Sequence, residues 1–428
     1  MADARPSRGR FALLLVAAAL IVAAPSAVVA FPSKLTTNGK LDFTYGSLVK
    51  SAGGVGTASK PESKLFYTGG DGLEPIRWWS VLGTSGPAPA AGVWIWELEE
   101  EDHTWDPEVQ LPQADPWAKA DTVFDDGTLY VSTRDDRASE TGNPRESSLY
   151  RIPYLGAGTW GEPLGPTVIT TSNVETLTIA RDSAGRLWTT YEMGSKIRVG
   201  STTPLGTTFT FSTLSQTNVK GDDISSVTAF AGNRIGVFWS DQNARKDVFA
   251  WRSDLAPISM SSWTIETAYG GGVGGCPTIT SPLCADDHMN VKVFQDQVYV
   301  AIKTSLNDAS PSSPLDPQVA LLRRDPDGTW SAFAVSPVAQ NATRPIVVLD
   351  PSESTLWVWA TRGSEIDVWE SPFASPSFDS SGYVPWVKGV TVNDATSTKQ
   401  VSTDATGAVV MVSAGGKKQY WHNEFLPD

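Results

Sequence analysis

The sequence contains few of the residues that build metal and redox sites. Its 428 residues include 2 cysteines and 3 histidines, and Cys276 and Cys284 lack the CxxC spacing of a zinc or redox motif. It also contains no phosphate-binding loop and no nucleophile elbow. We therefore expect no metal centre and no organic cofactor. The one alternative is a structural calcium ion on the Asp-rich turns 125–126 or 325–327.

Positive charge is also scarce. The chain has 33 basic and 47 acidic residues, a net charge of −14. Such a surface repels phosphate backbones and anionic lipid head groups. This excess of acidic residues argues against nucleic acid as a partner.

Long apolar runs are absent apart from one near the start. Phe11–Ala24 is uncharged and apolar, follows three arginines, and is followed by the small residues Val28 and Ala30 at a cleavage-like site. As a helix this run would span about 21 Å, which is short of the roughly 30 Å hydrocarbon core of a membrane. We predict a cleaved export signal over residues 1–30, no membrane insertion, and a secreted single domain over residues 31–428. In that compartment Cys276 and Cys284 are predicted to form a disulfide, with zinc ligation as the alternative.

No stretch after residue 30 shows a sustained helical period, and the 37 glycines, 29 prolines and 17 tryptophans suit short strands joined by tight turns. One pattern occurs seven times: an apolar strand, a turn built on Gly, Asp or Asn, and a strand that usually carries an aromatic residue. The second strands align on Trp79, Tyr130, Trp188, Gly236, Tyr299, Trp357 and Val410. Repeats of this length match the four-stranded blades of a β-propeller. The sequence therefore predicts an all-β, seven-bladed β-propeller, with a pair of β-sandwiches as the alternative.

A propeller must close its ring, because open sheet edges aggregate. The last repeat ends after three strands, and residues 41–49 have the composition of a strand. We expect this N-terminal segment to supply the outer strand of the final blade.

The first strand of each propeller blade lines the central channel. Charged residues cluster at the predicted start of these strands, where Asp would ordinarily cap a turn. Convergence of such residues from five blades favours a functional site over five separate caps. The candidate catalytic residues are Glu175, Asp223, Asp287, His288, Arg344 and Lys399.

Two chemistries fit these residues. Glu175 with Asp223 or Asp287 would provide the two carboxylates of a glycosidase. Alternatively, His288 or Lys399 would abstract a proton beside a uronic acid carboxylate neutralised by Arg344, as in a lyase. The candidate substrate-binding residues are Trp105, Trp117, Asp121, Asn290 and Lys292.

One turn resembles the Asp box of sialidases and related propellers. Residues 324–330 read RDPDGTW, and residues 181–188, RDSAGRLW, form a looser copy. The resemblance implies a propeller in which the Asp and Gly shape a hairpin and the Trp packs between strands. The catalytic residues of sialidases find no match, so their activity is not implied. The repeat pattern is also similar to secreted polysaccharide lyase propellers, and that similarity is architectural.

These observations predict a secreted, monomeric, carbohydrate-active enzyme that acts on a polysaccharide or glycan at the channel mouth, as a glycoside hydrolase or a polysaccharide lyase. A lectin-like sugar-binding propeller and an extracellular interaction scaffold are the alternatives. A lectin would repeat one site in several blades. The channel residues differ from blade to blade, which favours a single asymmetric site.

Overall fold

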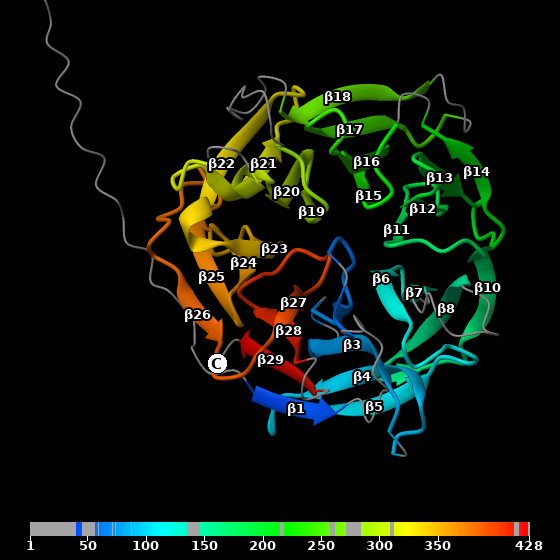
Figure 1. Cartoon of the computed structure of the whole chain (residues 1–428). Coiled ribbons are helices and arrows are strands. Elements are labelled where there is room, and N and C mark those ends of the chain that lie inside the picture. Colours follow the sequence, from blue (N-terminus) through cyan, green and yellow to red (C-terminus); the bar gives the residue numbers. More distant parts are fainter. Residues whose placement is uncertain are drawn as a thin grey trace, which may run out of the picture. The chain divides into compact units, whose positions relative to one another are not determined.

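The seven repeats form seven antiparallel sheets around a common axis (Figure 1). The structure, a computed structural model, describes residues 40–44, 56–58, 60–70, 72, 74–86, 88–134, 146–214, 218–256, 262–270, 284–308, 312–414 and 419–426. All of these residues belong to one compact unit, residues 34–428. The predicted seven-bladed β-propeller is confirmed.

The first three blades follow the chain from the axis outward. Their strands are β2 (Leu65–Thr68), β3 (Arg77–Thr84), β4 (Gly92–Glu99) and β5 (Thr104–Gln110); β6 (Lys119–Asp125), β7 (Thr128–Arg134), β8 (Ser147–Gly156) and β10 (Leu164–Thr170), with β9 (Thr159–Trp160) beside β8; and β11 (Thr178–Arg181), β12 (Leu187–Glu192), β13 (Ile197–Ser201) and β14 (Thr210–Thr213).

Blades four to seven repeat this order. Their strands are β15 (Ser225–Phe230), β16 (Arg234–Asp241), β17 (Lys246–Ser253) and β18 (Thr264–Tyr269); β19 (Met289–Phe294), β20 (Gln297–Lys303), β21 (Pro317–Arg324) and β22 (Trp330–Pro337); β23 (Ala342–Asp350), β24 (Thr355–Arg362), β25 (Glu365–Pro372) and β26 (Val384–Val387); and β27 (Asn393–Thr396), β28 (Ala408–Ala414), β29 (Gln419–Phe425) and β1 (Lys40–Thr44). The described helices are two short 3₁₀ turns, η2 (Leu306–Asp308) and η3 (Val338–Gln340), and none is long and apolar enough to cross a membrane.

The core consists of apolar layers between neighbouring blades. Phe66 and Trp79 of the first blade, for example, pack with Leu129 and Tyr150 of the second. Corresponding layers join each of the other adjacent pairs, including the last blade and the first. Each buried tryptophan removes about 150–250 Å² from water, worth roughly 4–6 kcal/mol at 25 cal/mol per Å². The aromatic second strands in the sequence therefore reflect contacts between blades.

The ring closes through the N-terminal strand. β1 pairs antiparallel with β29, with Lys40 opposite His422 and Thr44 opposite Gln419. The expected closing segment, 41–49, overlaps this strand over residues 41–44, and residues 45–49 lie outside the described residues. The last blade thus joins the two ends of the described chain.

The two Asp-box-like turns are folding elements. In the turn after β21, the Asp327 carboxylate accepts the Thr329 amide at 2.8 Å, and Gly328 adopts a φ of 92°. In the looser turn after β11, the buried Asp182 carboxylate accepts the amides of Ala184 and Arg186 and, at 2.6 Å, the indole N–H of Trp188. Both turns lie between strands of a single blade, as the resemblance implied.

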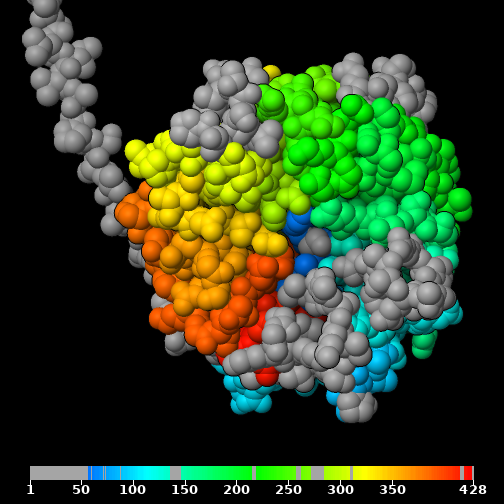
Figure 2. Space-filling view, viewed as in Figure 1, coloured from blue at the N-terminus to red at the C-terminus, as the bar shows by residue number. Residues whose placement is uncertain are grey.

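One element of the structure has no counterpart in the repeat pattern. The threading segment, residues 56–58 and 60–64, contacts several blades before β2 begins, and Figure 2 shows blue atoms of this part of the chain at the centre of the ring. Ser63 donates its amide to Asp121 of β6 at 2.8 Å, and the Lys292 ammonium of β19 donates to the Ser63 hydroxyl at 3.1 Å. The Thr57 amide donates to Ser413 of β28 at 2.8 Å. The channel is therefore lined by seven blades and occupied by a segment of the same chain.

Candidate functional site

The inner strands bring residues from distant parts of the sequence to one end of the channel. Glu175 lies three residues before β11, Asp223 two before β15, and His288 directly before β19. Because the inner strands of a propeller run in the same direction along the axis, the residues that precede them gather at one rim. We call this rim the mouth.

A chain of ion pairs joins two blades and the threading segment at the mouth. The Lys60 ammonium binds Glu175 Oε1 at 2.8 Å and also contacts Asp287 Oδ2. On its other side, Asp287 Oδ1 lies 2.8 Å from His288 Nδ1, and Asp286 Oδ1 lies 2.5 Å from the same nitrogen. The mouth cluster is Lys60, Glu175, Asp286, Asp287, His288 and Lys303. Three of the six predicted catalytic residues, Glu175, Asp287 and His288, therefore meet within it.

Asp286 fixes the orientation of the histidine. Its second oxygen accepts the Ser305 hydroxyl at 2.8 Å and contacts the Lys303 ammonium. His288 Nε2, the other ring nitrogen, is buried and has no hydrogen-bond partner among the described residues. A histidine held at one nitrogen by a carboxylate, with its second nitrogen unengaged, has the arrangement of an oriented general acid or base.

The charges of the cluster reinforce one another. Burial opposes ionisation of Asp287, but the hydrogen bond and charge of His288, together with Lys60, outweigh it and lower the pKa of that carboxyl. Burial likewise opposes the charge of Lys60, while Asp287 and Glu175 raise its pKa. Asp287 is therefore an anion at neutral pH. Glu175 is the most accessible member of the ion-pair chain, with 38% of its side chain exposed.

Further carboxylates make the mouth acidic. Burial raises the pKa of Glu192, and Asp223, Glu175 and Asp222 raise it further by charge. Such crowding of carboxylates favours neutral or cationic ligands over polyanionic ones.

The other three predicted catalytic residues have different partners. Asp223 is fully buried and accepts the Ser240 hydroxyl at 2.9 Å and the Lys220 amide at 2.8 Å, and burial raises its pKa to about 6. Arg344 Nε binds Asp394 Oδ1 at 2.9 Å. Arg344 lies at a bulge of β23 with a φ of 55°, and Asp394 has a φ of 56°. Such left-handed residues persist where their surroundings hold them.

Lys399 lies beyond the start of the inner strands, because it follows β27. Its ammonium donates to the Ile179 carbonyl at 2.7 Å and contacts the Asp121 carboxylate. Asp121 is buried and also accepts the Ser63 and Ile179 amides, each at 2.8 Å. This network lies inside the channel, away from the mouth cluster.

The predicted substrate-binding residues are dispersed. Trp105 is buried in β5, and its indole donates to His422 of the last blade at 3.2 Å. Trp117 is half-buried and packs against the same layer between the last blade and the first. Asn290 accepts the Val347 amide at 3.3 Å and so ties β19 to β23. Lys292 lies inside the channel with Lys399 and Asp121. None of these contacts joins the mouth cluster.

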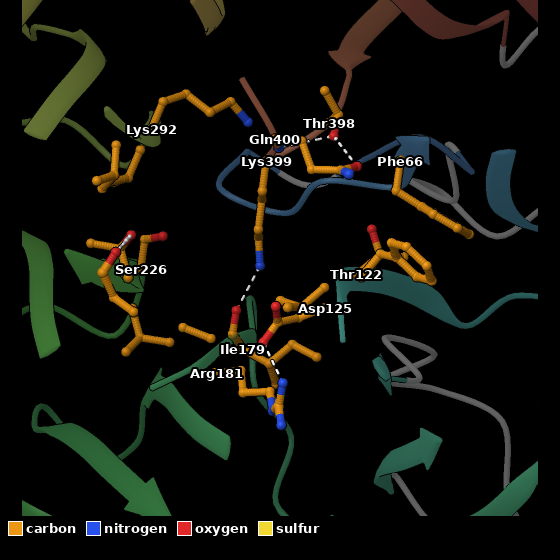
Figure 3. Close-up of a pocket in the computed structure, with 18 of the residues that line it drawn as sticks. Phe66, Thr122, Asp125, Ile179, Arg181, Ser226, Lys292, Thr398, Lys399 and Gln400 are labelled. Carbon is orange, nitrogen blue, oxygen red and sulfur yellow. Dashed lines mark hydrogen bonds and ion pairs between the residues drawn. The ribbon is translucent and has the colours of Figure 1, made fainter. Parts of the chain in front are cut away.

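A cavity of about 330 Å³ opens farther along the inner strands. Its lining includes Asp125 and Arg181 at the ends of β6 and β11, together with Lys292, Lys399 and Phe66 (Figure 3). The channel therefore has two chemically different ends, an acidic mouth and a cavity that contains lysines.

Within the part of the chain that the structure describes, one set of side chains could contact a cation. Oxygen and nitrogen atoms of Asp286, Asp287 and His288 lie within 4.8 Å of one another. The ammonium groups of Lys60 and Lys303 already bind these two carboxylates. A metal ion would have to displace both, so the residues do not fit a cation in this arrangement.

The repeat pattern gave no signal for the threading segment. Lys60, Glu62 and Lys64 precede the first blade in the run KPESK, and an alternating charged run directly before a channel strand is the only local indication of their role. Lys303 is not among the predicted site residues, because it ends the second strand β20 and does not precede an inner strand. Cys276 lies outside the described residues, so its disulfide with the buried Cys284 stays a prediction.

No family model and no curated protein matches the chain. Among solved structures, the polysaccharide lyase Uly1 aligns with a TM-score of 0.48 at 9% identity over 86% of this chain and 90% of that one. An ulvan lyase bound to -[GlcA(1-4)Rha3S]- aligns with a TM-score of 0.48 at 11% identity over 86% and 93%. A putative 6-phosphogluconolactonase from Bacteroides uniformis has a TM-score of 0.47 at 14% identity over 86% and 98%. These likenesses concern the propeller architecture alone.

Proposed function

We propose that this protein is a carbohydrate-active enzyme that hydrolyses a neutral glycan at the mouth. The observation that carries the proposal is the convergence of Glu175 and Asp287, from different blades, on one ammonium group, with His288 bonded to Asp287. Two hydrogen bonds of about 3 Å to one nitrogen keep the two carboxylate oxygens within about 6 Å of each other. The carboxyl groups of retaining glycosidases lie about 5–5.5 Å apart.

The environments of the two carboxylates suit different roles. Asp287 is held as an anion by His288 and Lys60, which fits the nucleophile that attacks the anomeric carbon. Glu175 is the more exposed group and would take the role of the acid that protonates the leaving oxygen and later activates water, once substrate has displaced the Lys60 ammonium from it. His288, oriented by Asp286, positions Asp287 by hydrogen bonding.

Charge favours hydrolysis over elimination next to a uronate. A lyase needs cationic groups to neutralise the substrate carboxylate. Arg344, the predicted partner for that carboxylate, is paired with Asp394, and the carboxylates around Glu192 would repel a polyuronate. A lyase is the second candidate because His288 Nε2 has no hydrogen-bond partner among the described residues and would accept a proton when the ring is neutral.

A panel of neutral and acidic polysaccharides incubated with the protein tests the proposal. Hydrolysis releases reducing ends without new ultraviolet absorbance, whereas elimination adds the absorbance of an unsaturated uronic product. We expect reducing ends alone, from a neutral glycan. Glu175→Gln and Asp287→Asn should each lower kcat by about 10²–10⁴-fold, and the exposed Glu101→Gln is the matched control.

Three results would count against it. Elimination products that depend on His288 would favour the lyase. Saturable glycan binding without turnover would favour a lectin-like propeller. Absence of both binding and turnover across the panel would favour an interaction scaffold.

We also propose that residues 1–30 are removed on export and that residues 31–428 act as a secreted monomer. The support is the charged, apolar and small-residue sequence of the first thirty residues. Intact-mass measurement of protein recovered from the medium, with sizing by light scattering, tests both statements.

A further inference from the structure

The cavity is chemically distinct from the mouth and does not share its residues. It is lined by residues within the inner strands, such as Arg181 in β11 and Thr228 in β15, whereas Glu175, Asp287 and His288 precede those strands. Lysines from two blades, Lys292 and Lys399, reach it across the channel (Figure 3). These two lysines bring positive charge together in a chain whose net charge is −14.

Lys292 is the least compensated cation in this part of the molecule. Only 3% of the residue is exposed, and its ammonium makes one hydrogen bond among the described residues, to the Ser63 hydroxyl at 3.1 Å. An ammonium group has three donors. Burial, reinforced by the charge of Lys399, lowers the pKa of Lys292 to about 7. An anion that binds beside such a buried lysine stabilises its charged form and raises its pKa.

The charged groups around Lys292 do not neutralise it. Lys399 is bound to the Asp121 carboxylate and the Ile179 carbonyl, and Asp121 is the anion that acts most strongly on Lys292. On the wall, Arg181 pairs with Asp125 at 2.5 Å and lies 3.7 Å from the exposed Asp126. The two lysines therefore share one carboxylate, Asp121, which leaves one ammonium group without an anionic partner of its own in the part of the chain that the structure describes.

The rest of the lining is mainly apolar, with polar side chains from Thr122, Ser226, Thr228, Thr398 and Gln400. Phe66 and Phe124 lie on one side, with ring centroids 5.8 Å apart, and Val227 and Val293 contribute from other blades. The volume of about 330 Å³ is at the lower end of the range for small-molecule sites. A ligand that fits would be small, with an oxyanion at one end and an apolar face at the other.

We propose that this cavity binds a small organic oxyanion of sugar-acid size, whose anionic group accepts hydrogen bonds from Lys292 and Lys399 while its apolar face contacts Phe66 and Phe124. The site is separate from the mouth and does not depend on the proposed hydrolysis. Its ligand would act as an effector and not as a product of the neutral glycan.

Calorimetric titration of the full chain with sodium D-glucuronate, inorganic phosphate and D-glucose tests the proposal. We expect glucuronate to bind, phosphate to bind more weakly, and glucose not to bind. The bound anion should return Lys292 to its charged form. Glucuronate affinity should therefore fall about tenfold for each pH unit above 7.

Lys292→Met should lower glucuronate affinity at least 30-fold. This variant removes a poorly compensated buried charge, so the melting temperature should stay the same or rise. The exposed Lys388→Met is the matched control and should bind glucuronate as the parent does. Equal binding of glucose, binding of phosphate alone, affinity that does not change between pH 6.5 and 8.5, or unchanged binding by Lys292→Met would each overturn the proposal. Glycan turnover can be measured separately, so failure of this site and failure of the proposed hydrolysis are distinguishable.

Discussion

Removing the carboxylate of Glu62 should destabilise the protein more than any substitution at the mouth. Glu62 is buried in the threading segment, and its Oε1 accepts Arg134 Nε at 2.7 Å and the Leu177 amide at 3.3 Å. Its Oε2 accepts the Lys64 ammonium at 3.3 Å. Burial opposes ionisation, but Arg134, Lys64 and Lys119 outweigh it and lower the pKa of Glu62. One carboxylate therefore compensates buried cations from two separate parts of the chain.

Glu62→Gln keeps the size of the side chain and removes its charge. Arg134 and Lys64, with side-chain exposures of 2% and 0%, would remain buried without their anion. Breaking a buried pair by removing one partner costs about 3–5 kcal/mol. Because the pKa of Glu62 in the folded protein is lowered, its contribution is present above the ordinary value of 4.5 and disappears as the pH falls through the folded value. The penalty should therefore be full at pH 7 and should shrink below about pH 4.5.

Urea unfolding followed by tryptophan fluorescence measures this penalty at pH 7 and pH 4. The exposed Glu101→Gln should change the free energy of unfolding by less than about 0.5 kcal/mol. Adding Lys64→Met to Glu62→Gln should restore part of the lost free energy of unfolding. The second substitution removes one of the two buried cations that Glu62 had compensated. A loss below about 1 kcal/mol at pH 7, or no recovery in the double variant, would refute the view that this network holds the threading segment in the channel.

Three further predictions concern other parts of the ring. Burial raises the pKa of Asp223 to about 6, so the native state binds more protons than the unfolded state between pH 4 and 6. The parent should therefore lose stability relative to Asp223→Asn as the pH rises through that window, and parallel stability curves would contradict this. Asp182→Ala should cost about 2–4 kcal/mol in urea unfolding, because the Trp188 indole and two turn amides lose their acceptor; a cost below 0.5 kcal/mol would argue against a folding role for the turn. Titration of the denatured, unreduced protein should find no free thiol if Cys276 and Cys284 are bonded, whereas two thiols per chain would disprove the disulfide.

The candidate site was predicted in part. Glu175, Asp287 and His288 could be found because a channel residue precedes an inner strand by a near-constant number of positions. Asp223 has the same spacing, yet its carboxylate accepts hydrogen bonds from the Lys220 amide of its own loop and from the Ser240 hydroxyl of β16. Sequence spacing gives a position along a strand, but the direction of a side chain depends on the donors around it.

The propeller follows from the sequence alone, because blades are local structures. Each hairpin is formed by residues close in sequence, and an aromatic residue such as Trp79 or Trp357 is placed between blades by its position in the second strand. Only the tertiary structure decided what fills the channel. Lys60, Glu62 and Ser63 belong to no repeat, and their partners Asp287, Arg134 and Lys292 lie about 70 to 230 residues away in the sequence. Contacts between residues so far apart leave no periodic pattern in the sequence, because they form only when the ring has closed around the segment.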